Sequence, residues 1–285
     1  MSLIEETGVA PASPTIEVDG VRLAYSREGK GPAVVCLHAI GHGGRDFDAF
    51  ANAVRDRFEV IRLDWPGQGR SGPDKRPAST ARYAELLAGV ITQLKLDRPI
   101  LLGNSVGGAA SLIYAASHPV TALVLCDPGG LVEVTPGITR ACQIFARLFA
   151  AGARGAWWYK PMFWAYYTLL VLPAAAAGPQ RRRIIAASYE IAPVLRDAWT
   201  SFGTPDADIR ALAKNLEVPV WFAWATGDRI AQLKLCLPVI EAMKNARLTR
   251  FGGGHTAFLE RPKPFAKGFT AFVKSLADEG KTRRR

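Results

Sequence analysis

The sequence predicts an α/β domain with a mostly parallel, doubly wound sheet that is interrupted by a helical insertion. Short apolar runs, such as 33–38 and 121–126, alternate with segments of helix length, as parallel strands and their crossover helices do. Between about 131 and 216 no strand-like run occurs. We therefore expect a first part of the core at 1–130, a helical cap at 131–216 and a second part of the core at 217–285.

The order of the elements follows from the hydrophobic pattern. Two short alternating runs flank Asp19-Gly20, which is typical of a hairpin turn. Continuous apolar runs predict strands that are buried on both faces of the sheet. The expected strands are 15–18, 21–25, 33–38, 58–64, 99–103, 121–126, 218–225 and 246–251, and the expected helices of the core are 46–57, 80–94, 106–118, one after 225 and 262–276.

The composition is that of an ordinary globular domain, with 49% apolar and 21% charged residues in 285. The net charge of +11 comes mostly from scattered Lys and Arg, and the basic runs 181–183 and 281–285 are not interleaved with aromatic residues, so we expect no nucleic-acid partner. The four cysteines form no C-x-x-C pair, which favours reduced thiols over a metal site. The stretch 1–6 lacks the pattern of a signal peptide, so a cytoplasmic protein is expected.

The predicted cap contains an uncharged stretch, 161–180, of about the length that spans a bilayer. Prolines at 161, 173 and 179 argue against a membrane-spanning helix. Aromatic residues around the stretch suit an apolar lid over a small apolar substrate, and a weak contact with a membrane surface is the alternative. These aromatic residues are Trp157, Trp158, Tyr159, Trp164, Tyr166 and Tyr167.

The pentapeptide Gly103-Asn104-Ser105-Val106-Gly107 follows the apolar run 99–102. A strand, a tight turn that carries Ser105 and a helix that begins directly after it would explain this pattern. The glycines two residues before and after the serine leave room where the strand packs against the helix. Such a turn exposes the serine hydroxyl and aims the backbone N–H of Val106 at an oxyanion formed there.

Several motifs occur together in the order that the α/β-hydrolase superfamily uses. They are His38-Ala39-Ile40-Gly41, Asp64-Trp65-Pro66-Gly67-Gln68-Gly69-Arg70-Ser71, the pentapeptide around Ser105, Gly227-Asp228-Arg229 and Gly254-His255. The chain resembles this superfamily over nearly its whole length, in the branch of capped esterases and carbon–carbon bond hydrolases with a serine nucleophile. The resemblance implies the α/β-hydrolase fold and a triad in the chain order serine, acid, histidine.

The resemblance assigns Ser105 as the nucleophile and His255 as the base. Among the other histidines, His118 precedes a proline at a helix end, and His38 and His42 lie in the loop that resembles the oxyanion loop of the family. Asp228 occupies the commoner position of the acid, and Asp127 occupies the position that some relatives use instead. Both acids remain candidates.

The oxyanion hole would use the backbone N–H groups of Ile40 and Val106. Ala39 stands where relatives commonly have glycine, and its methyl group could alter the path of this loop. Asp64 is expected to shape its own loop. The sequence contains no metal-binding constellation and no nucleotide-binding glycine motif, so we expect no cofactor.

The sequence thus indicates a serine hydrolase that cleaves an ester, or a related acyl bond, of a fairly apolar small molecule. An aspartate at the position of Ser105 would indicate a dehalogenase or an epoxide hydrolase, so both are disfavoured. Asn104 before the serine resembles the carbon–carbon bond hydrolases of ring-cleavage diketones, although Thr256 follows His255 where those relatives often have an aromatic residue. A non-catalytic small-molecule-binding protein on the same fold is the alternative from another class.

Overall fold

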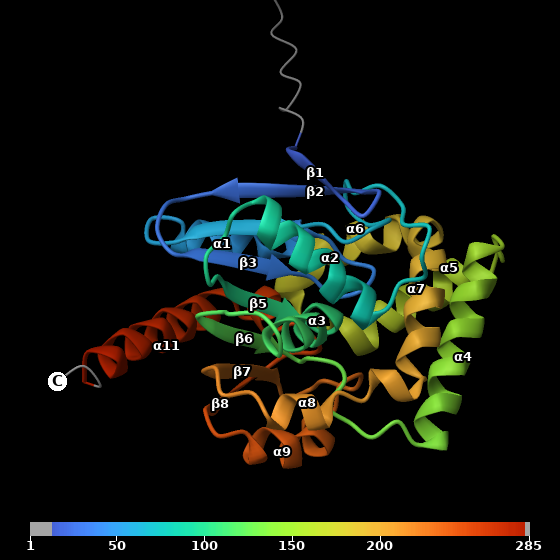
Figure 1. The fold of residues 1–285 in the computed structure, drawn as a ribbon. Helices are drawn as coiled ribbons and strands as arrows, with labels where there is room; N and C mark the ends of the chain where they lie inside the picture. Colours follow the sequence, from blue (N-terminus) through green and yellow to red (C-terminus); the bar gives the residue numbers. More distant parts are fainter. Residues whose placement is uncertain (1–12, 283–285) are drawn as a thin grey trace, which may run out of the picture.

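The computed structural model describes residues 13–282. The stretch 1–6, on which the expectation of a cytoplasmic protein rests, lies outside the described residues, as does the end of the basic tail at 283–285. The predicted α/β architecture is confirmed: a mostly parallel sheet is covered by helices on both faces (Figure 1).

The sheet has eight strands in the order β1-β2-β4-β3-β5-β6-β7-β8. The β1–β2 and β2–β4 pairs are antiparallel, and all other neighbouring pairs are parallel. Because the parallel strands end at one edge, the loops that follow β3, β5, β6, β7 and β8 meet there. The strands are β1 Thr15–Val18, β2 Val21–Glu28, β3 Ala33–Leu37, β4 Glu59–Leu63, β5 Ile100–Asn104, β6 Ala122–Cys126, β7 Val220–Ala225 and β8 Ala246–Phe251.

Alternate strand residues pack into two separate cores. In β3, Val35 and Leu37 join the core under α2, α3 and α9, whereas Val34 and Cys36 join the core under α1 and α11. This two-sided burial explains why the parallel strands are continuous apolar runs. The helices of this part are α1 Asp48–Val54, preceded by the 3₁₀ turn η1 Gly44–Phe47, α2 Thr80–Gln93, α3 Val106–Ala115, α9 Leu233–Ala242, α10 Ala257–Glu260 and α11 Pro262–Thr282.

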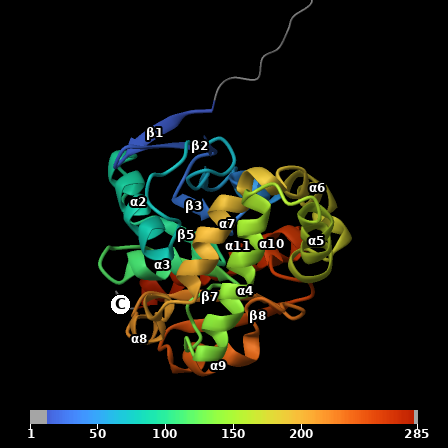
Figure 2. The ribbon, with the colours of Figure 1, turned by 90° about the vertical axis from the view of Figure 1, so that its right-hand side faces the viewer.

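The segment between β6 and β7 contains helices and turns without a strand, and α4 and α7 pack side by side in it (Figures 1 and 2). The uncharged stretch 161–180 is divided among α5, η2, η3 and α6. Within residues 13–282, no helix is long and apolar enough to cross a membrane. The elements are α4 Pro136–Ala153, α5 Tyr159–Tyr166, the π-helical turn η2 Tyr167–Val171, η3 Ala175–Ala177, α6 Gly178–Ala186, α7 Ser188–Phe202, η4 Pro205–Ala207 and α8 Arg210–Lys214.

Candidate active site

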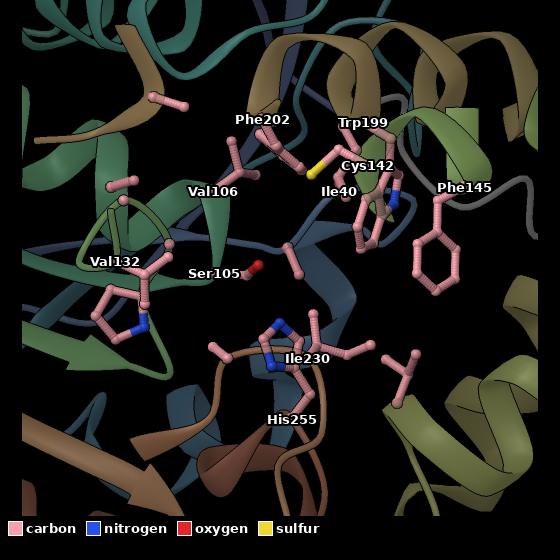
Figure 3. Close-up of a pocket in the computed structure, with 18 of the residues that line it drawn as sticks. Ile40, Ser105, Val106, Val132, Cys142, Phe145, Trp199, Phe202, Ile230 and His255 are labelled. Atoms are coloured by element: carbon pink, nitrogen blue, oxygen red, sulfur yellow. The ribbon is translucent and has the colours of Figure 1, made fainter. Parts of the chain in front are cut away.

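Ser105 lies on the sharp turn between β5 and α3. Its backbone has φ 52° and ψ −116°, a conformation that L-residues adopt only under strain. The two flanking glycines make the turn possible, because a Cβ on Gly103 would lie 2.4 Å from the carbonyl oxygen of Gly107, and one on Gly107 would lie 2.2 Å from that of Leu37. The turn places the side chain of Ser105 in the wall of a cavity (Figure 3).

His255 reaches the same cavity from the glycine-rich loop after β8 (Figure 3). The loop is fixed from several sides. Val171 of η2 accepts a hydrogen bond from the backbone N–H of His255 (2.9 Å), and the Asn104 amide donates to the backbone carbonyl of His255 (3.0 Å). The buried carboxylate of Glu260 accepts from the N–H of Gly254 (2.6 Å). These bonds fix the backbone that carries the imidazole, and the side chain is buried.

Asp228 is the acid that contacts His255. Its Oδ2 lies 2.7 Å from Nδ1 of His255, and its Oδ1 accepts from the backbone N–H groups of Ile230 (2.7 Å) and Ala231 (2.9 Å). Burial disfavours the protonated imidazole, but the charge and the hydrogen bond of Asp228 outweigh it and raise the pKa of His255 to about 8. Nδ1 then carries a proton toward Asp228, which leaves Nε2 as the proton acceptor.

Asp127, the second candidate acid, is fully buried after β6 in a left-handed conformation (φ 46°). Its Oδ1 accepts from the backbone N–H of Ala225 (2.8 Å), and its Oδ2 has no hydrogen-bond partner in the described part of the chain. Burial, followed by the negative charge of Asp228, raises the pKa of Asp127 well above its ordinary value. Asp127 does not line the cavity, but it is close enough to Asp228 and His255 to feel their charges. Its surroundings favour the neutral carboxyl.

The loop after β3 is locked by His38 and Gln68. Nδ1 of His38 lies 2.7 Å from the carbonyl oxygen of Ala39, and its Nε2 accepts from the N–H of Trp65 (2.9 Å). Burial lowers the pKa of His38, which favours the neutral ring that this pattern requires. The amide oxygen of Gln68 accepts from the N–H of Gly41 (2.5 Å), a contact that sequence reasoning missed.

The two backbone donors that the sequence assigns to the oxyanion hole are unpaired. Within the described residues, the N–H groups of Ile40 and Val106 have no hydrogen-bond partner, and both residues line the cavity beside Ser105. Val106 is the first residue of α3, where N–H groups lack intrahelical acceptors. Ala39 is buried and does not adopt a left-handed conformation, so its methyl group is accommodated without backbone strain.

Asp64 shapes its own loop, as the sequence predicts. Its Oδ1 accepts from the N–H of Gly44 (2.7 Å), and its Oδ2 accepts from the N–H of Arg70 (3.0 Å). The carboxylate therefore joins the loops after β3 and β4, and it does not line the cavity.

The cavity between the sheet edge and the helices of the 127–219 segment has a volume of about 430 Å³. Its wall is mostly apolar, and among residues 13–282 the exposed Arg229 is the one Lys, Arg, Asp or Glu that lines it. Apolar residues labelled in Figure 3 are Ile40, Val106, Val132, Cys142, Phe145, Trp199, Phe202 and Ile230. Among residues 13–282, no group of His, Cys, Asp and Glu could hold a metal ion.

A sheet of this strand order, with a serine at the turn after the fifth strand, has the architecture of the α/β hydrolases. The profile of the Alpha/beta hydrolase family matches residues 34–267, so the chain belongs to this family and is a hydrolase enzyme.

Two kinds of relatives are similar to this chain. The 2-hydroxy-6-oxononadienedioate/2-hydroxy-6-oxononatrienedioate hydrolase of Burkholderia vietnamiensis is 27% identical over 281 residues, which cover 89% of this chain and 91% of that protein. Among solved structures, a thermophilic esterase from Thermogutta terrifontis aligns with a TM-score of 0.76 at 19% identity and covers 93% of this chain and 97% of its own. The enol-lactonase from Burkholderia xenovorans LB400 aligns with a TM-score of 0.76 at 21% identity and covers 92% and 100%.

Proposed function

We propose that the protein is a serine esterase that cleaves esters of fairly apolar small molecules through an acyl-enzyme. The observation that carries this proposal is the 2.7 Å contact between Asp228 and His255 at the wall of an apolar cavity that also contains Ser105. A serine hydroxyl needs a neutral imidazole to accept its proton, and the imidazole needs a carboxylate to fix its tautomer. In this proposal Ser105 supplies the hydroxyl, His255 the imidazole and Asp228 the carboxylate, all at one wall of the cavity.

The reaction proceeds in two halves. Nε2 of His255 takes the proton of Ser105 as the serine oxygen attacks the ester carbonyl carbon, and the N–H groups of Ile40 and Val106 stabilise the negative oxygen of the tetrahedral intermediate. The C–O bond to the alcohol then breaks, and His255 returns the proton to the departing alcohol. Water repeats the sequence on the acyl-serine and releases the carboxylic acid, which restores Ser105.

A carbon–carbon bond hydrolase is the second candidate, because a 27% identical relative bears the name of a dienedioate hydrolase. A dioate carries two carboxylates, and burying a carboxylate without a partner is costly. The cavity wall offers one arginine, Arg229, and that side chain is exposed. Asn104, the residue that suggests this class in the sequence, does not line the cavity and instead bonds the backbone of Cys126 and His255. These facts favour a neutral ester.

Labelling with a fluorophosphonate probe tests the proposed nucleophile. Mass spectrometry of the labelled protein should locate the adduct on Ser105, and Ser105→Ala should abolish both the labelling and the hydrolysis of p-nitrophenyl butyrate. The same preparation should hydrolyse the ester much faster than a ring-cleavage dienedioate. An adduct on another residue, or undiminished hydrolysis by a folded Ser105→Ala variant, would overturn the assignment.

A further inference from the structure

A second histidine–aspartate pair lies at the wall of the cavity, outside the proposed triad. Nδ1 of His42 is 2.5 Å from Oδ2 of Asp46, and both side chains are almost completely buried, with 1% and 0% exposure. The other oxygen of Asp46 accepts from the amide of Gln180 on α6, and Arg183 of the same helix donates to Gln180 in turn. The carboxylate thus has partners on both oxygens, so His42 is fixed through Nδ1.

The remaining ring nitrogen of His42, Nε2, is not used by Asp46, and it belongs to a side chain of the cavity wall. His42 lines the cavity, and its Nε2 has no hydrogen-bond partner within residues 13–282. The residue lies two positions after Ile40, and its N–H bonds the carbonyl of Ala39 (3.2 Å), which places it in the loop of the proposed oxyanion hole.

We propose that His42 is a specificity residue that binds a hydroxyl group on the substrate, close to the scissile ester. This inference rests on the proposed esterase function. With Nδ1 bound to Asp46, Nε2 accepts a hydrogen bond when the ring is neutral and donates one when it is protonated. A hydroxyl can do both, whereas a carbonyl can only accept and an amide N–H can only donate. In a mostly apolar cavity, this atom would lose its hydrogen bonds to water when an ester without a hydroxyl binds.

Matched pairs of esters test this inference. The acyl side is compared with p-nitrophenyl 3-hydroxybutyrate and p-nitrophenyl butyrate, and the alcohol side with 2-hydroxyethyl butyrate and propyl butyrate. In at least one pair, the wild-type enzyme should prefer the hydroxylated ester by about tenfold in kcat/KM. His42→Phe should remove the preference, and His42→Gln, which keeps a polar group, should retain part of it.

The control is His118→Phe, which changes a histidine that does not line the cavity and should leave the preference intact. Thermal melting identifies any variant that fails to fold. If His42→Phe fails to fold, the preferences of the wild type and of His42→Gln decide whether His42 binds the hydroxyl. Equal kcat/KM for both members of both pairs in the wild type would overturn the role of His42. Absence of probe labelling at Ser105 would instead overturn the proposed function, so the two failures are distinguishable.

A different observation concerns the outer surface of the segment between β6 and β7. From 134 to 189 the chain contains no Asp or Glu, and its basic residues are Arg140, Arg147, Arg154, Lys160, Arg181, Arg182 and Arg183. The same segment exposes large apolar side chains, among them Trp157 (86% exposed), Trp164 (54%) and Leu169 (62%). The helices α4 and α5, which carry Arg140, Arg147, Lys160 and Trp164, lie together at one end of the molecule (Figures 1 and 2).

We infer that this surface binds the face of an anionic lipid bilayer. Tryptophan is favoured at the boundary between headgroups and acyl chains, and basic residues are attracted to anionic headgroups. Arg154 and Trp157 lie in the connection between α4 and α5, and Lys160 and Trp164 lie on α5, so positive charge and exposed tryptophans occur close together along the chain, as this partner requires. Such a contact is peripheral, and it would bring the enzyme close to apolar esters that partition into the membrane.

Cosedimentation of the whole protein with vesicles tests the inference. Binding is expected to vesicles of phosphatidylcholine with phosphatidylglycerol at low salt, and it should weaken with added salt and without phosphatidylglycerol. The double variant Arg147→Glu, Arg154→Glu should lower the partition coefficient at least about fivefold for each unit of charge removed. The control is Lys263→Glu, Lys267→Glu on α11, which makes the same change in net charge at another place and should have less effect. Trp157→Ser with Trp164→Ser should also weaken binding. No binding at low salt, or an equal loss in the α11 control, would overturn the inference.

Discussion

The raised pKa of His255 predicts how activity depends on pH. The base must be neutral to take the proton of Ser105, and Asp228 raises the pKa of His255 to about 8. At pH 7 only about a tenth of the free enzyme then carries the neutral base, and at pH 6 only about a hundredth. For a neutral ester, kcat/KM should therefore rise about tenfold per pH unit and level off above pH 8.

Removal of the Asp228 carboxylate tests whether the pH dependence of kcat/KM comes from His255 rather than from another titrating group. In Asp228→Asn the burial of His255 remains while the main cause of its raised pKa is lost, so the midpoint should move to lower pH. The plateau should fall by about 10⁴, because the imidazole loses the partner that fixes its tautomer. The assay is the initial rate on p-nitrophenyl butyrate from pH 5 to 10, with a single-turnover measurement to show that acylation is observed. A wild-type midpoint at or below 6.5, or an unmoved midpoint in Asp228→Asn, would refute the reasoning.

The raised pKa of His255 also predicts how the free energy of unfolding changes with pH. The pKa of His255 is raised from 6.5 to about 8 in the folded protein, so folding favours the protonated ring by about 2 kcal/mol. This contribution is fully present below pH 6.5 and is lost as pH rises through 8. The enzyme should therefore gain activity over the pH range in which it loses this part of its stability, and Asp228→Asn should reduce the difference between urea denaturation at pH 6 and at pH 9.

Three further substitutions test the scaffold around the site. Asp127→Asn mimics the neutral carboxyl and should keep kcat/KM within about tenfold of wild type, whereas Asp127→Leu should lower the melting temperature by leaving a buried N–H unpaired; a large loss of activity in the Asn variant alone would mean that the charged form matters. Gly107→Ala should cost about 1–3 kcal/mol in urea denaturation, since its Cβ would lie 2.2 Å from the carbonyl oxygen of Leu37, and an unchanged midpoint would contradict the close packing. Gln68→Leu should lower kcat by about tenfold to a hundredfold with little change in KM, because the N–H of Gly41 loses its acceptor; unaltered kcat would show that the loop holds its shape without this bond.

The sequence predicts the sheet well because each parallel strand has a distinct local pattern. A strand such as 121–126 must be apolar on both faces, and the turn at Ser105 needs small residues at two defined positions. The proposed triad residues Ser105, Asp228 and His255 can also be chosen from the sequence, because each stands in a short motif and the motifs follow one another in the chain order of the family. The helix expected at 46–57 is only partly correct, since its first residues form a 3₁₀ turn and α1 ends at Val54.

The residues that sequence reasoning missed bond to parts of the chain that are far away in the sequence. Glu260 and Gln68 are ordinary polar residues in the sequence, and only the packing of loops shows that they hold Ala174 and Gly41. Asn104 suggests a type of chemistry in the sequence, but in the structure its amide joins β5 to β6 and to the loop of His255. Side chains that bond the backbone of distant loops leave no periodic signal.

The hydrogen bonds between the segment that follows β6 and the rest of the chain limit how the cavity can open. The backbone N–H of His255 donates to Val171, the N–H of Ala174 donates to Glu260, and Gln180 donates to Asp46. A rigid lifting of this region would break all three bonds and leave buried polar groups unpaired, at about 1–3 kcal/mol each. It would also release the backbone of the proposed base. The exposed lining residues are Arg229, Gln232 and Leu235 near the start of α9 and Ala141 on α4. We expect a substrate to enter at this edge, because these three bonds can then stay intact.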